Sequence, residues 1–498
     1  MVLLERAWAL CLKPNPSIQQ ALVHALITNA NGCARVEQWQ RAKNLNRRAL
    51  ELEPDQPQAL SNLAVAELRS HRLDQAMHWS KKAINALPND PQVLNNHGTI
   101  LQETGAFTEA DALYQRVLQL NQAHPNALAN RGCIAHQQGR LNDAKNLYKQ
   151  HLHSFPEDVR VWVNLAGVLL MQENWNEGWK AYEKRNKNAE SIMSIPPGIQ
   201  RWKGPDQKAS HLLVVHEQGL GDSFQFVRYL PATRSHAQRV SYSGPTKLHA
   251  LFQHSDLIEH CVDPEQSDAA MLSSTINDVD AWVPLLSLPA LLTSSGEPTQ
   301  VNHPYLQASE ELSAKWQQTL KPNQNPLVAL HWQGNPEHEM TLSRGRSIPL
   351  QTLSPLLNFK DVNWISLQKG PGSEQIDALE LRQRFHPCQN KVEACWDFEQ
   401  TAAILMNCDL VITSDSGLAH LAAGLGRPTW LLLTHMPEWR WGLKGSHTNW
   451  YPTMRLFRQT KHGDWESLIK EQLLPAFRNW QASAKPFNAA ENLNRRAE

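Results

Sequence analysis

The feature that most constrains the fold is an interval of 34 residues that recurs through the first third of the chain. Small residues recur at this interval in two phases, and leucines, prolines and tyrosines recur in three more. The series are Ala42, Ala76, Ala110, Ala144 and Gly178; Ala30, Ala64, Gly98, Gly132 and Ala166; Leu26, Leu60, Leu94 and Leu128, with Trp162 in the next place; Pro57, Pro91 and Pro125; and Tyr114, Tyr148 and Tyr182. Small residues at fixed places let two helices approach closely, so each unit is expected to be a helical hairpin.

This pattern is typical of the tetratricopeptide repeat (TPR), and we expect a helical array over residues 1–186. Stacked hairpins form a superhelix whose concave face generally binds proteins or peptides. The alternative is that the array only supports or dimerises the next domain, because repeats specify a shape and not a ligand. Residues 187–210 lose the period and contain turn-forming residues, including Pro196, Pro197 and Gly204, so they are predicted to be a linker.

From His211 onward the chain alternates short apolar runs with helical stretches. Strands are predicted at residues 212–216, 327–332, 363–368, 409–413 and 429–433. This alternation favours parallel sheets with helices on both faces. The predicted fold class is therefore α + α/β, a helical solenoid followed by two Rossmann-like lobes at residues 211–320 and 321–480, with a polar tail at 481–498.

Two strand-to-helix turns carry the strongest chemical signal. The first contains Gly219, Gly221 and Asp222, and the second runs from Asp415 through Ser416 and Gly417 into a helix that contains His420. Ligands of open α/β sheets lie beyond the carboxyl ends of the strands. A helix start offers unpaired N–H groups and a positive dipole end, which suit a diphosphate. The residues alone therefore predict a phosphate-bearing ligand.

Composition and simple patterns exclude several classes of function. The 48 Lys and Arg residues balance 48 Asp and Glu residues, so no net field favours nucleic acid. The seven cysteines are scattered and form no C-x-x-C pair, which predicts reduced thiols. No signal peptide and no apolar run of membrane-spanning length is evident, so we expect a cytoplasmic protein without a membrane span. Asp278 and Asp280 are interpreted as a solvated strand entry, and no metal site is predicted.

Several motifs together resemble bacterial TPR proteins that carry a glycosyltransferase family 9 (heptosyltransferase-like) domain. The resemblance covers residues 217–469. It rests on the segments at 216–222 with 229–231, 344–349, 366–370 with Glu374, 414–420, 439–441, 450–452 and 455–458.

The resemblance implies a GT-B fold and inverting transfer from a nucleoside-diphosphate sugar, without a cofactor or an essential metal. By resemblance Asp222 is the catalytic base, and Arg346 neutralises the leaving diphosphate. Ser416 and Gly417 donate to that diphosphate, and Glu374 binds the ribose. Asp415 and His420 match donor-site positions whose roles are less defined.

Two departures from the family restrict what can be transferred to this chain. Heptosyltransferases commonly have Lys where this chain has Arg346, and they lack the repeats. The sugar, the nucleotide base and the acceptor therefore stay open, and the candidate acceptors are a protein, a peptide, a glycan or a lipid-linked saccharide. The repeats are similar to those of O-GlcNAc transferases, in which the repeats present protein substrates to the enzyme. The motifs of this chain are closer to those of the heptosyltransferases. A dehydrogenase is disfavoured, because Phe224 stands where the third glycine of its fingerprint is required.

Each candidate residue also has a structural interpretation. Asp222 and Asp415 are candidate helix caps, Arg346 a candidate surface ion pair, and His420 a candidate core histidine. The aromatic residues near 439–451 are candidates either for sugar stacking or for packing. The competing function is a non-catalytic TPR scaffold whose nucleotide-sugar domain is vestigial.

Overall fold

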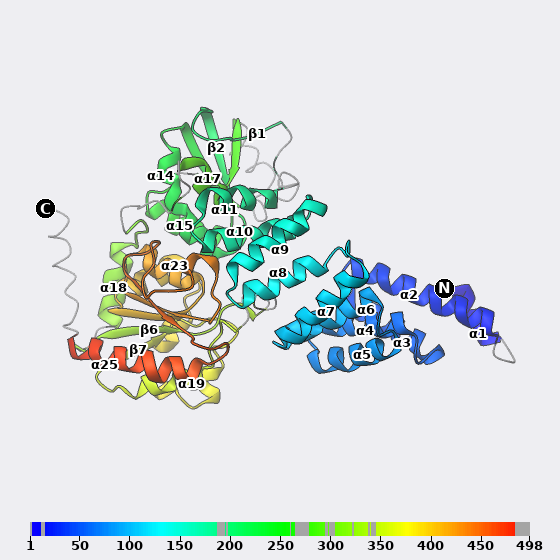
Figure 1. Cartoon of the computed structure of the whole chain (residues 1–498). Helices are drawn as coiled ribbons and strands as arrows, with labels where there is room; N and C mark the ends of the chain where they lie inside the picture. The colour runs from blue at the N-terminus through cyan, green and yellow to red at the C-terminus, as the bar shows by residue number, and fades with distance from the viewer. Residues whose placement is uncertain are drawn as a thin grey trace. The chain divides into compact units, whose positions relative to one another are not determined.

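The computed structural model describes residues 2–10, 15–186, 195, 198–258, 260–263, 278–293, 297, 304–320, 323–336, 339 and 345–483 (Figure 1). The chain divides into two compact units, Met1–Val168 and Leu169–Glu498. Much of the predicted linker (187–194 and 196–197), most of the predicted tail (484–498) and Arg344 of one motif lie outside the described residues.

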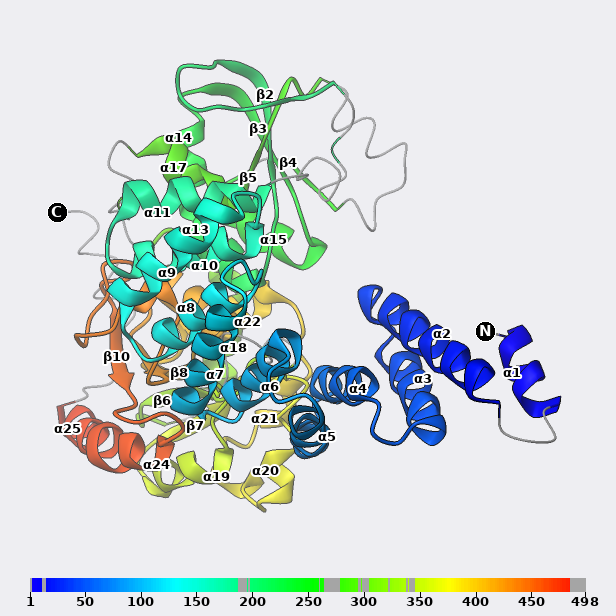
Figure 2. The same cartoon turned by 45° about the vertical axis from the view of Figure 1, so that its right-hand side comes forward.

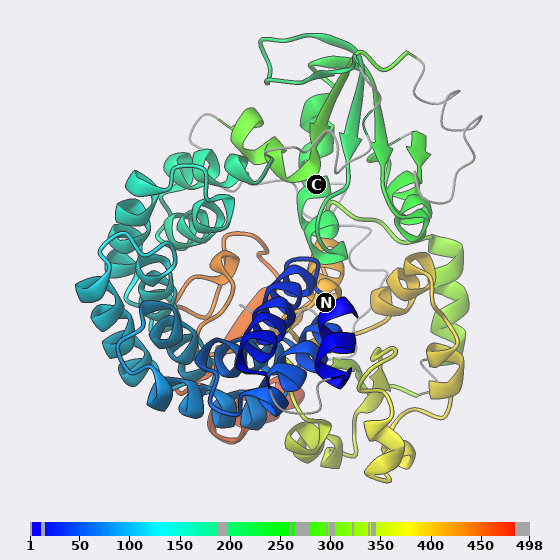
Figure 3. The same cartoon turned by 90° about the vertical axis from the view of Figure 1, so that its right-hand side faces the viewer.

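The first unit is a curved row of helices that pack as successive hairpins (Figure 3). Its helices are α1 Val2–Leu10, α2 Pro16–Arg35, α3 Trp39–Leu52, α4 Pro57–Arg69, α5 Leu73–Ala86, α6 Pro91–Glu103, α7 Phe107–Leu120, α8 Ala127–Gln137 and α9 Leu141–Ser154. Helix α10, Val159–Met171, crosses the boundary between the units. Pro57 and Pro91 begin their helices, a position where the missing proline N–H has no cost.

The periodic small residues make room for the periodic tyrosines. A Cβ added to Gly98 would lie 2.8 Å from Tyr114 Cε1, and one added to Gly132 would lie 2.5 Å from Tyr148 Cε1. Both tyrosines are fully buried. The backbone follows the same interval of 34 residues. The turn inside each hairpin contains a residue with positive φ, at positions 37, 71, 105, 139 and 173. The 34-residue pattern thus fixes both the packing and the turns of each hairpin.

The second unit contains two separate parallel sheets (Figure 2). The amino-terminal lobe has the order β1-β5-β2-β3-β4, formed by β1 Gln200–Arg201, β2 Ala209–Val215, β3 Ala237–Ser243, β4 His260–Val262 and β5 Ala281–Pro284. Leu213 of β2 lies opposite Ser241 on one side and Trp282 on the other. Strand β1 and the start of β2 lie within the segment predicted as a linker.

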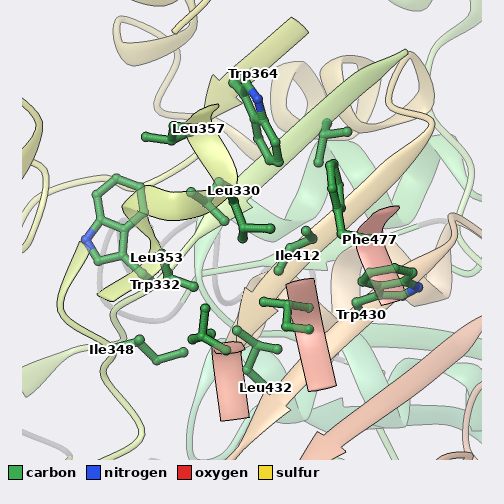
Figure 4. Close-up of a cluster of buried hydrophobic side chains, with 14 of the residues drawn as sticks. Leu330, Trp332, Ile348, Leu353, Leu357, Trp364, Ile412, Trp430, Leu432 and Phe477 are labelled. Carbon is green, nitrogen blue, oxygen red and sulfur yellow. The ribbon is translucent and has the colours of Figure 1, made fainter. Parts of the chain in front are cut away.

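The carboxyl-terminal lobe has the order β10-β9-β8-β6-β7, formed by β6 Leu327–His331, β7 Asn363–Ser366, β8 Leu410–Ser414, β9 Thr429–Leu433 and β10 Met454–Arg458. Alternate side chains of these strands, including Leu330, Ile412 and Leu432, enter one core (Figure 4). Phe477 stacks there on Trp364 at 5.2 Å between ring centroids. Both faces are covered by helices, which explains why these strands are apolar almost throughout.

The helices of the second unit are mostly short. They are α11 Trp175–Tyr182, η1 Glu183–Asn186, α13 Leu220–Phe226, η2 Val227–Tyr229, α14 Leu230–Thr233, α15 Thr246–His254, η3 Leu285–Ser287, α17 Leu288–Leu292, α18 Glu310–Leu320, α19 Leu350–Leu353, η5 Ser354–Asn358, α20 Gln375–Ala378, η6 Arg382–Arg384, α21 Gln389–Glu393, α22 Phe398–Met406, α23 Gly417–Gly424, η7 Trp439–Trp441, α24 Trp465–Ser467, the π-helical η8 Leu468–Leu473 and α25 Leu474–Ser483. Within the described part of the chain, no helix combines the length and the apolar character needed to cross a membrane.

The sequence predicted the class of fold correctly, namely a helical repeat array followed by parallel α/β sheets. Both sheets reverse their strand order in the middle. The reversal falls between β2 and β5 in one lobe and between β6 and β8 in the other. Crevices at such switch points are where open α/β sheets bind ligands. The turns after β2 and β8 are the two that the sequence singled out.

Candidate functional site

The turn after β2 places Asp222 in the first turn of α13. Gly219 is the N-cap of this helix, and its N–H donates to Asp222 Oδ2 at 3.0 Å. Gln218, just before it, has a φ of 62°, in the left-handed region that non-glycine residues rarely adopt. Asp222 therefore does have the capping role that the sequence offered as its structural interpretation.

The turn after β8 places Asp415 and Ser416 at the start of α23. Ser416 is the N-cap by backbone geometry, but its side chain does not cap the helix. Its hydroxyl instead lies 3.3 Å from His331 Nδ1, at the end of β6. Asp415 Oδ2 accepts from Trp441 Nε1 at 2.9 Å. Burial raises the pKa of Asp415, although the nearby charge of Arg346 opposes that shift.

The two turns touch through their glycines. A Cβ added to Gly221 would lie 3.2 Å from Gly417 Cα, and one added to Gly417 would lie 3.4 Å from the Gly221 nitrogen. No side chain larger than hydrogen fits this contact without a shift. The starts of α13 and α23, from different lobes, therefore meet backbone to backbone, with Asp222 one residue beyond the contact.

An arginine that the sequence did not assign a role lies against Asp222. Arg440 of η7 donates to Asp222 Oδ1 and to Gln225 Oε1, and its Nη1 lies 2.9 Å from Glu438 Oε2. The side chain of Arg440 is only 9% exposed. Its guanidinium also lies 4.8 Å from the centre of the Trp439 ring. Arg440 thus joins the two lobes at the candidate base.

Burial raises the pKa of Glu438 to about 7, although Arg440 opposes that shift. Burial also lowers the pKa of His331 to about 4, and the charge of Arg346 acts in the same direction. At neutral pH His331 is therefore uncharged and can donate or accept a hydrogen bond without adding charge to the site.

Arg346 lies at the exit of β6. Its guanidinium packs on Gly334, where an added Cβ would lie 2.9 Å from Arg346 Nε. Its Nε is 3.5 Å from Glu339 Oε1 and has no hydrogen-bond partner among the described residues. The Arg346 side chain is 21% exposed. A buried, unsatisfied N–H on a partly open guanidinium suits an anionic ligand, because such groups are costly to leave unpaired.

Glu374 lies on the loop that follows β7 and is exposed. This loop is fastened to the exit of β6, because Gly372 O accepts from Trp332 Nε1 at 3.2 Å and Gln368 Oε1 accepts from the backbone N–H groups of Trp332 and Gln333. The loop therefore stands at the carboxyl edge of the sheet, on the β7 side of the switch point. Nothing in the contacts of Glu374 itself assigns it a ligand.

His420 and its aromatic neighbours form a packed cluster. His420 is 5% exposed, its Nδ1 lies 2.8 Å from Tyr451 Oη, and its ring stacks on Trp441 at 5.3 Å. Burial lowers its pKa well below the ordinary value. These contacts agree with the core interpretation of His420, while its part in donor binding stays a prediction. Trp439 and Trp450 also pack in the interior, as the second interpretation of these aromatic residues expects.

Asp278 and Asp280 stand before β5. Asp280 accepts from the backbone N–H groups of Ser210 and His211, both at 2.9 Å, and Asp278 pairs with His211 and Arg239. Within the ranges that the structure describes, no cluster of three or more His, Cys, Asp or Glu side chains is arranged to hold a metal ion.

The structure thus brings Gly219, Gly221, Asp222, Asp415, Ser416, Gly417 and His420 to one contact between the lobes. Arg346 acts electrostatically on Asp415, whereas Glu374 lies on a neighbouring loop. Sequence reasoning missed Arg440, Glu438 and His331. Arg440 lies in a motif that supported the resemblance, but no spacing rule links it to Asp222, which is 218 residues away.

Comparison with known proteins agrees with this architecture. Residues 363–450 match the family profile "Glycosyltransferase family 9 (heptosyltransferase)". Tetratricopeptide-repeat profiles match residues 35–95, 91–124 and 130–185. The last repeat match ends one residue before Asn186, so it includes α11 and most of η1.

One curated relative is Protein FlbA of Caulobacter vibrioides, 26% identical over 335 residues, which are 64% of this chain and 55% of the relative. The chain thus spans about half the length of that relative. Among solved structures, a family 9 glycosyltransferase from Veillonella parvula DSM 2008 is 13% identical, covering 57% of this chain and all of its own, with a TM-score of 0.43. Pseudomonas aeruginosa PilF is 22% identical, covering 33% of this chain and 76% of its own, with a TM-score of 0.31.

Proposed function

We propose that this chain, which carries tetratricopeptide repeats in its N-terminal part and a glycosyltransferase family 9 domain behind them, transfers a sugar from a nucleoside-diphosphate sugar to an acceptor hydroxyl with inversion and without a metal. The observation that supports this most strongly is the contact of Gly221 with Gly417. It joins a carboxylate on one lobe to a helix start that suits a diphosphate on the other.

The donor would lie against the carboxyl-terminal lobe. The N–H groups at Ser416 and Gly417 would donate to the diphosphate, and Arg346 would balance its charge. Neutral His331, beside Ser416, would add a hydrogen bond. Glu374 would accept from the ribose hydroxyls, and Asp415 and His420 would support the start of α23 from beneath the donor.

Asp222 would act as the general base. Its carboxylate accepts the proton of the acceptor hydroxyl while the acceptor oxygen attacks the anomeric carbon from the side opposite the diphosphate. The bond from that carbon to the diphosphate oxygen breaks, and the electron pair leaves with the diphosphate, where Arg346 stabilises it. One displacement inverts the anomeric configuration. General-base assistance of this kind typically contributes 10²–10⁴-fold.

The ion pair between Asp222 and Arg440 favours the alternative of a non-catalytic scaffold, because the guanidinium occupies the Asp222 oxygen that would otherwise accept a proton from the acceptor. We propose that the donor breaks this ion pair when it binds. A bound diphosphate carries at least two negative charges and would compete with Asp222 for Arg440. Donor binding would then free the base and add a second cation at the leaving group.

The repeats would recruit a protein, peptide or glycan acceptor, or a partner that presents it, since concave repeat surfaces generally bind such ligands. A cytoplasmic location, where nucleotide sugars are available as donors, is part of this proposal.

Thermal unfolding with UDP, GDP, ADP, dTDP and CMP sugars tests the donor site. A ligand at 100 times its dissociation constant should stabilise the native protein by about 2.7 kcal/mol. We expect one nucleotide class to do so and Arg346→Ala to weaken its binding by about tenfold or more, since charged hydrogen bonds contribute about 1.5–3 kcal/mol. Arg384→Ala is the control, because Arg384 is an exposed arginine in η6 of the same lobe. No stabilisation by any donor at millimolar concentration would contradict the proposal.

A further inference from the structure

The last repeat ends directly on the turn that holds Asp222. Tyr182 closes α11 and occupies the same place in the 34-residue period as Tyr114 and Tyr148. Unlike theirs, the hydroxyl of Tyr182 bonds to a residue outside the repeats. Its hydroxyl accepts from Gln218 Nε2 at 2.6 Å, whereas Tyr114 bonds Thr99 and Gln102.

This contact falls on the strained residue of the turn. Gln218 has a φ of 62°, a conformation that a non-glycine residue holds only when its surroundings fix it. The Gln218 side chain is tied to Tyr182, and the next residue, Gly219, donates its N–H to Asp222. Tyr182 therefore holds the side chain of Gln218, the residue directly before Gly219. The backbone N–H of Gly219 is the group that Asp222 caps.

A buried ion pair anchors the preceding residue of the same turn. Arg185 of η1 binds Glu217 with two parallel bonds, Nε to Oε2 at 2.9 Å and Nη2 to Oε1 at 2.6 Å. Both side chains are 8% exposed. Glu217 also accepts from the N–H of Leu286 at 3.0 Å, which links the pair to η3, directly after β5. The guanidinium of Arg185 lies 4.1 Å from the centre of the Tyr182 ring.

Helix α11 also contacts the carboxyl-terminal lobe. Trp179 packs edge-on against Phe226 of α13 at 6.1 Å and against Trp439, next to Arg440, at 5.5 Å. Trp175 packs edge-on against Trp450 at 6.3 Å. One helix of the repeat therefore touches both sides of the Asp222–Arg440 pair.

From these contacts we infer that Tyr182 and Arg185 are positioning residues for Asp222, so that the last repeat is a structural part of the catalytic turn. The inference rests on the proposed role of Asp222. It assigns to α11 and η1 a role that neither a peptide-binding surface nor a passive spacer requires. A spacer would need no side-chain bonds to Glu217 and Gln218.

Tyr182→Phe in the full chain tests this inference, because it removes one hydroxyl and keeps the ring. Tyr114→Phe is the matched control, since Tyr114 is a buried tyrosine of the same phase in the first unit. Hydrogen exchange is measured on peptides covering residues 216–226 and 410–424. We expect Tyr182→Phe to speed exchange in 216–226 by about three- to tenfold, the effect of one lost hydrogen bond, without changing 410–424. Tyr114→Phe should leave both peptides as in the wild type.

Steady-state kinetics provide the second readout. A displaced base lowers turnover but not donor binding, so Tyr182→Phe should lower kcat by roughly 10- to 100-fold with an unchanged donor KM. Arg185→Lys, which keeps the charge but loses the two-bond geometry, should have the same pattern. Exchange in 216–226 that matches the wild type in both variants would overturn the inference. If the wild type transferred no sugar, the proposed function would fail while the exchange result still decided this inference.

Discussion

At the scale of single residues, the candidate site holds less negative charge near neutral pH than its three carboxyl groups would carry if all were ionised. Asp222, Asp415 and Glu438 surround Arg440, and burial raises the pKa of Glu438 to about 7 and that of Asp415 above its usual value. A proton shared by this cluster near neutral pH would reduce its repulsion of a diphosphate. The positive charge of Arg346 also reduces this repulsion, although it opposes the rise in the pKa of Asp415.

His331 provides a prediction on pH. Burial lowers its pKa to about 4 in the fold, from 6.5 in the unfolded chain. Because the unfolded chain binds this proton first, the free energy of unfolding should fall as the pH falls from about 6.5 towards 4. The linkage relation gives a loss of about 2 kcal/mol at pH 5 relative to pH 8. Urea unfolding at both pH values should show that this loss is smaller by about that amount in His331→Asn.

The exposed His447, replaced by Asn, is the control for that experiment. An equal pH dependence in the wild type and in His331→Asn would mean that His331 is accessible to protons in the folded protein. It would then be charged at mildly acidic pH, and its proposed role as a neutral ligand would be wrong.

Local sequence patterns predicted where two of the candidate site residues lie, while their chemical roles stay predictions. Asp415 directly follows β8, and Asp222 lies in the first turn of the helix after β2, so strand pattern and turn chemistry were sufficient to place both at strand-to-helix turns. Arg440 and Tyr182 could not be predicted, because each acts on the turn from a distant part of the chain. Their importance depends on how the lobes and the last repeat pack, which no local pattern encodes.

At the scale of elements, strands that are mostly apolar were predictable and the polar or very short ones were not. The predictions for β6, β7, β8 and β9 agree with the structure within two residues, because each of these strands contains a run of apolar residues that is buried. Strand β3 begins with the polar sequence Ala-Gln-Arg, and β1 has only two residues. Such strands form because the adjacent strands of the sheet supply their backbone hydrogen bonds.

The contact between α13 and α23 provides a prediction at this scale. Gly221→Ala would place a methyl group 3.2 Å from the backbone of Gly417, so the two helix starts must separate. We expect a loss of about 1–3 kcal/mol in the free energy of unfolding, the usual effect of overpacking, together with reduced turnover. Urea unfolding measures the first effect and donor consumption the second.

Gly32→Ala is the matched control. Gly32 lies in α2 with open space around the position of its missing Cβ. There the substitution should stabilise the helix by about 0.5–1 kcal/mol. If Gly221→Ala were as stable and as active as the wild type, the glycine contact would have no role in bringing the turns together.

At the scale of the whole molecule, the repeat pattern and the compact units end at different places. The repeat profile continues to residue 185, but the second compact unit begins at Leu169 and includes α11. Sequence periodicity detects the hairpin, whereas the contacts of Tyr182 and Arg185 place its second helix with the second compact unit. One helix therefore serves both the repeat pattern and the candidate site.

Two deletions separate these roles. Removing residues 1–168 keeps α11, so we expect donor binding and basal donor hydrolysis to be retained while transfer to the natural acceptor falls. Removing residues 1–186 also removes Tyr182 and Arg185 and should reduce both transfer and hydrolysis. Isothermal titration with the donor and an assay of nucleoside-diphosphate release distinguish the outcomes. Full transfer by the shorter deletion would reduce the array to a structural accessory.

The central claim is that Asp222 removes a proton during sugar transfer. The most direct measurement is turnover of the donor identified by the nucleotide panel, in the wild type and in Asp222→Asn, with donor affinity measured in parallel. We predict that Asp222→Asn binds the donor at least as tightly as the wild type, because the amide no longer pairs with Arg440 as an ion, but turns it over about 10²–10⁴-fold more slowly. Equal turnover by the two proteins would remove Asp222 from the mechanism, and donor binding without turnover in the wild type would contradict the assignment as a transferase.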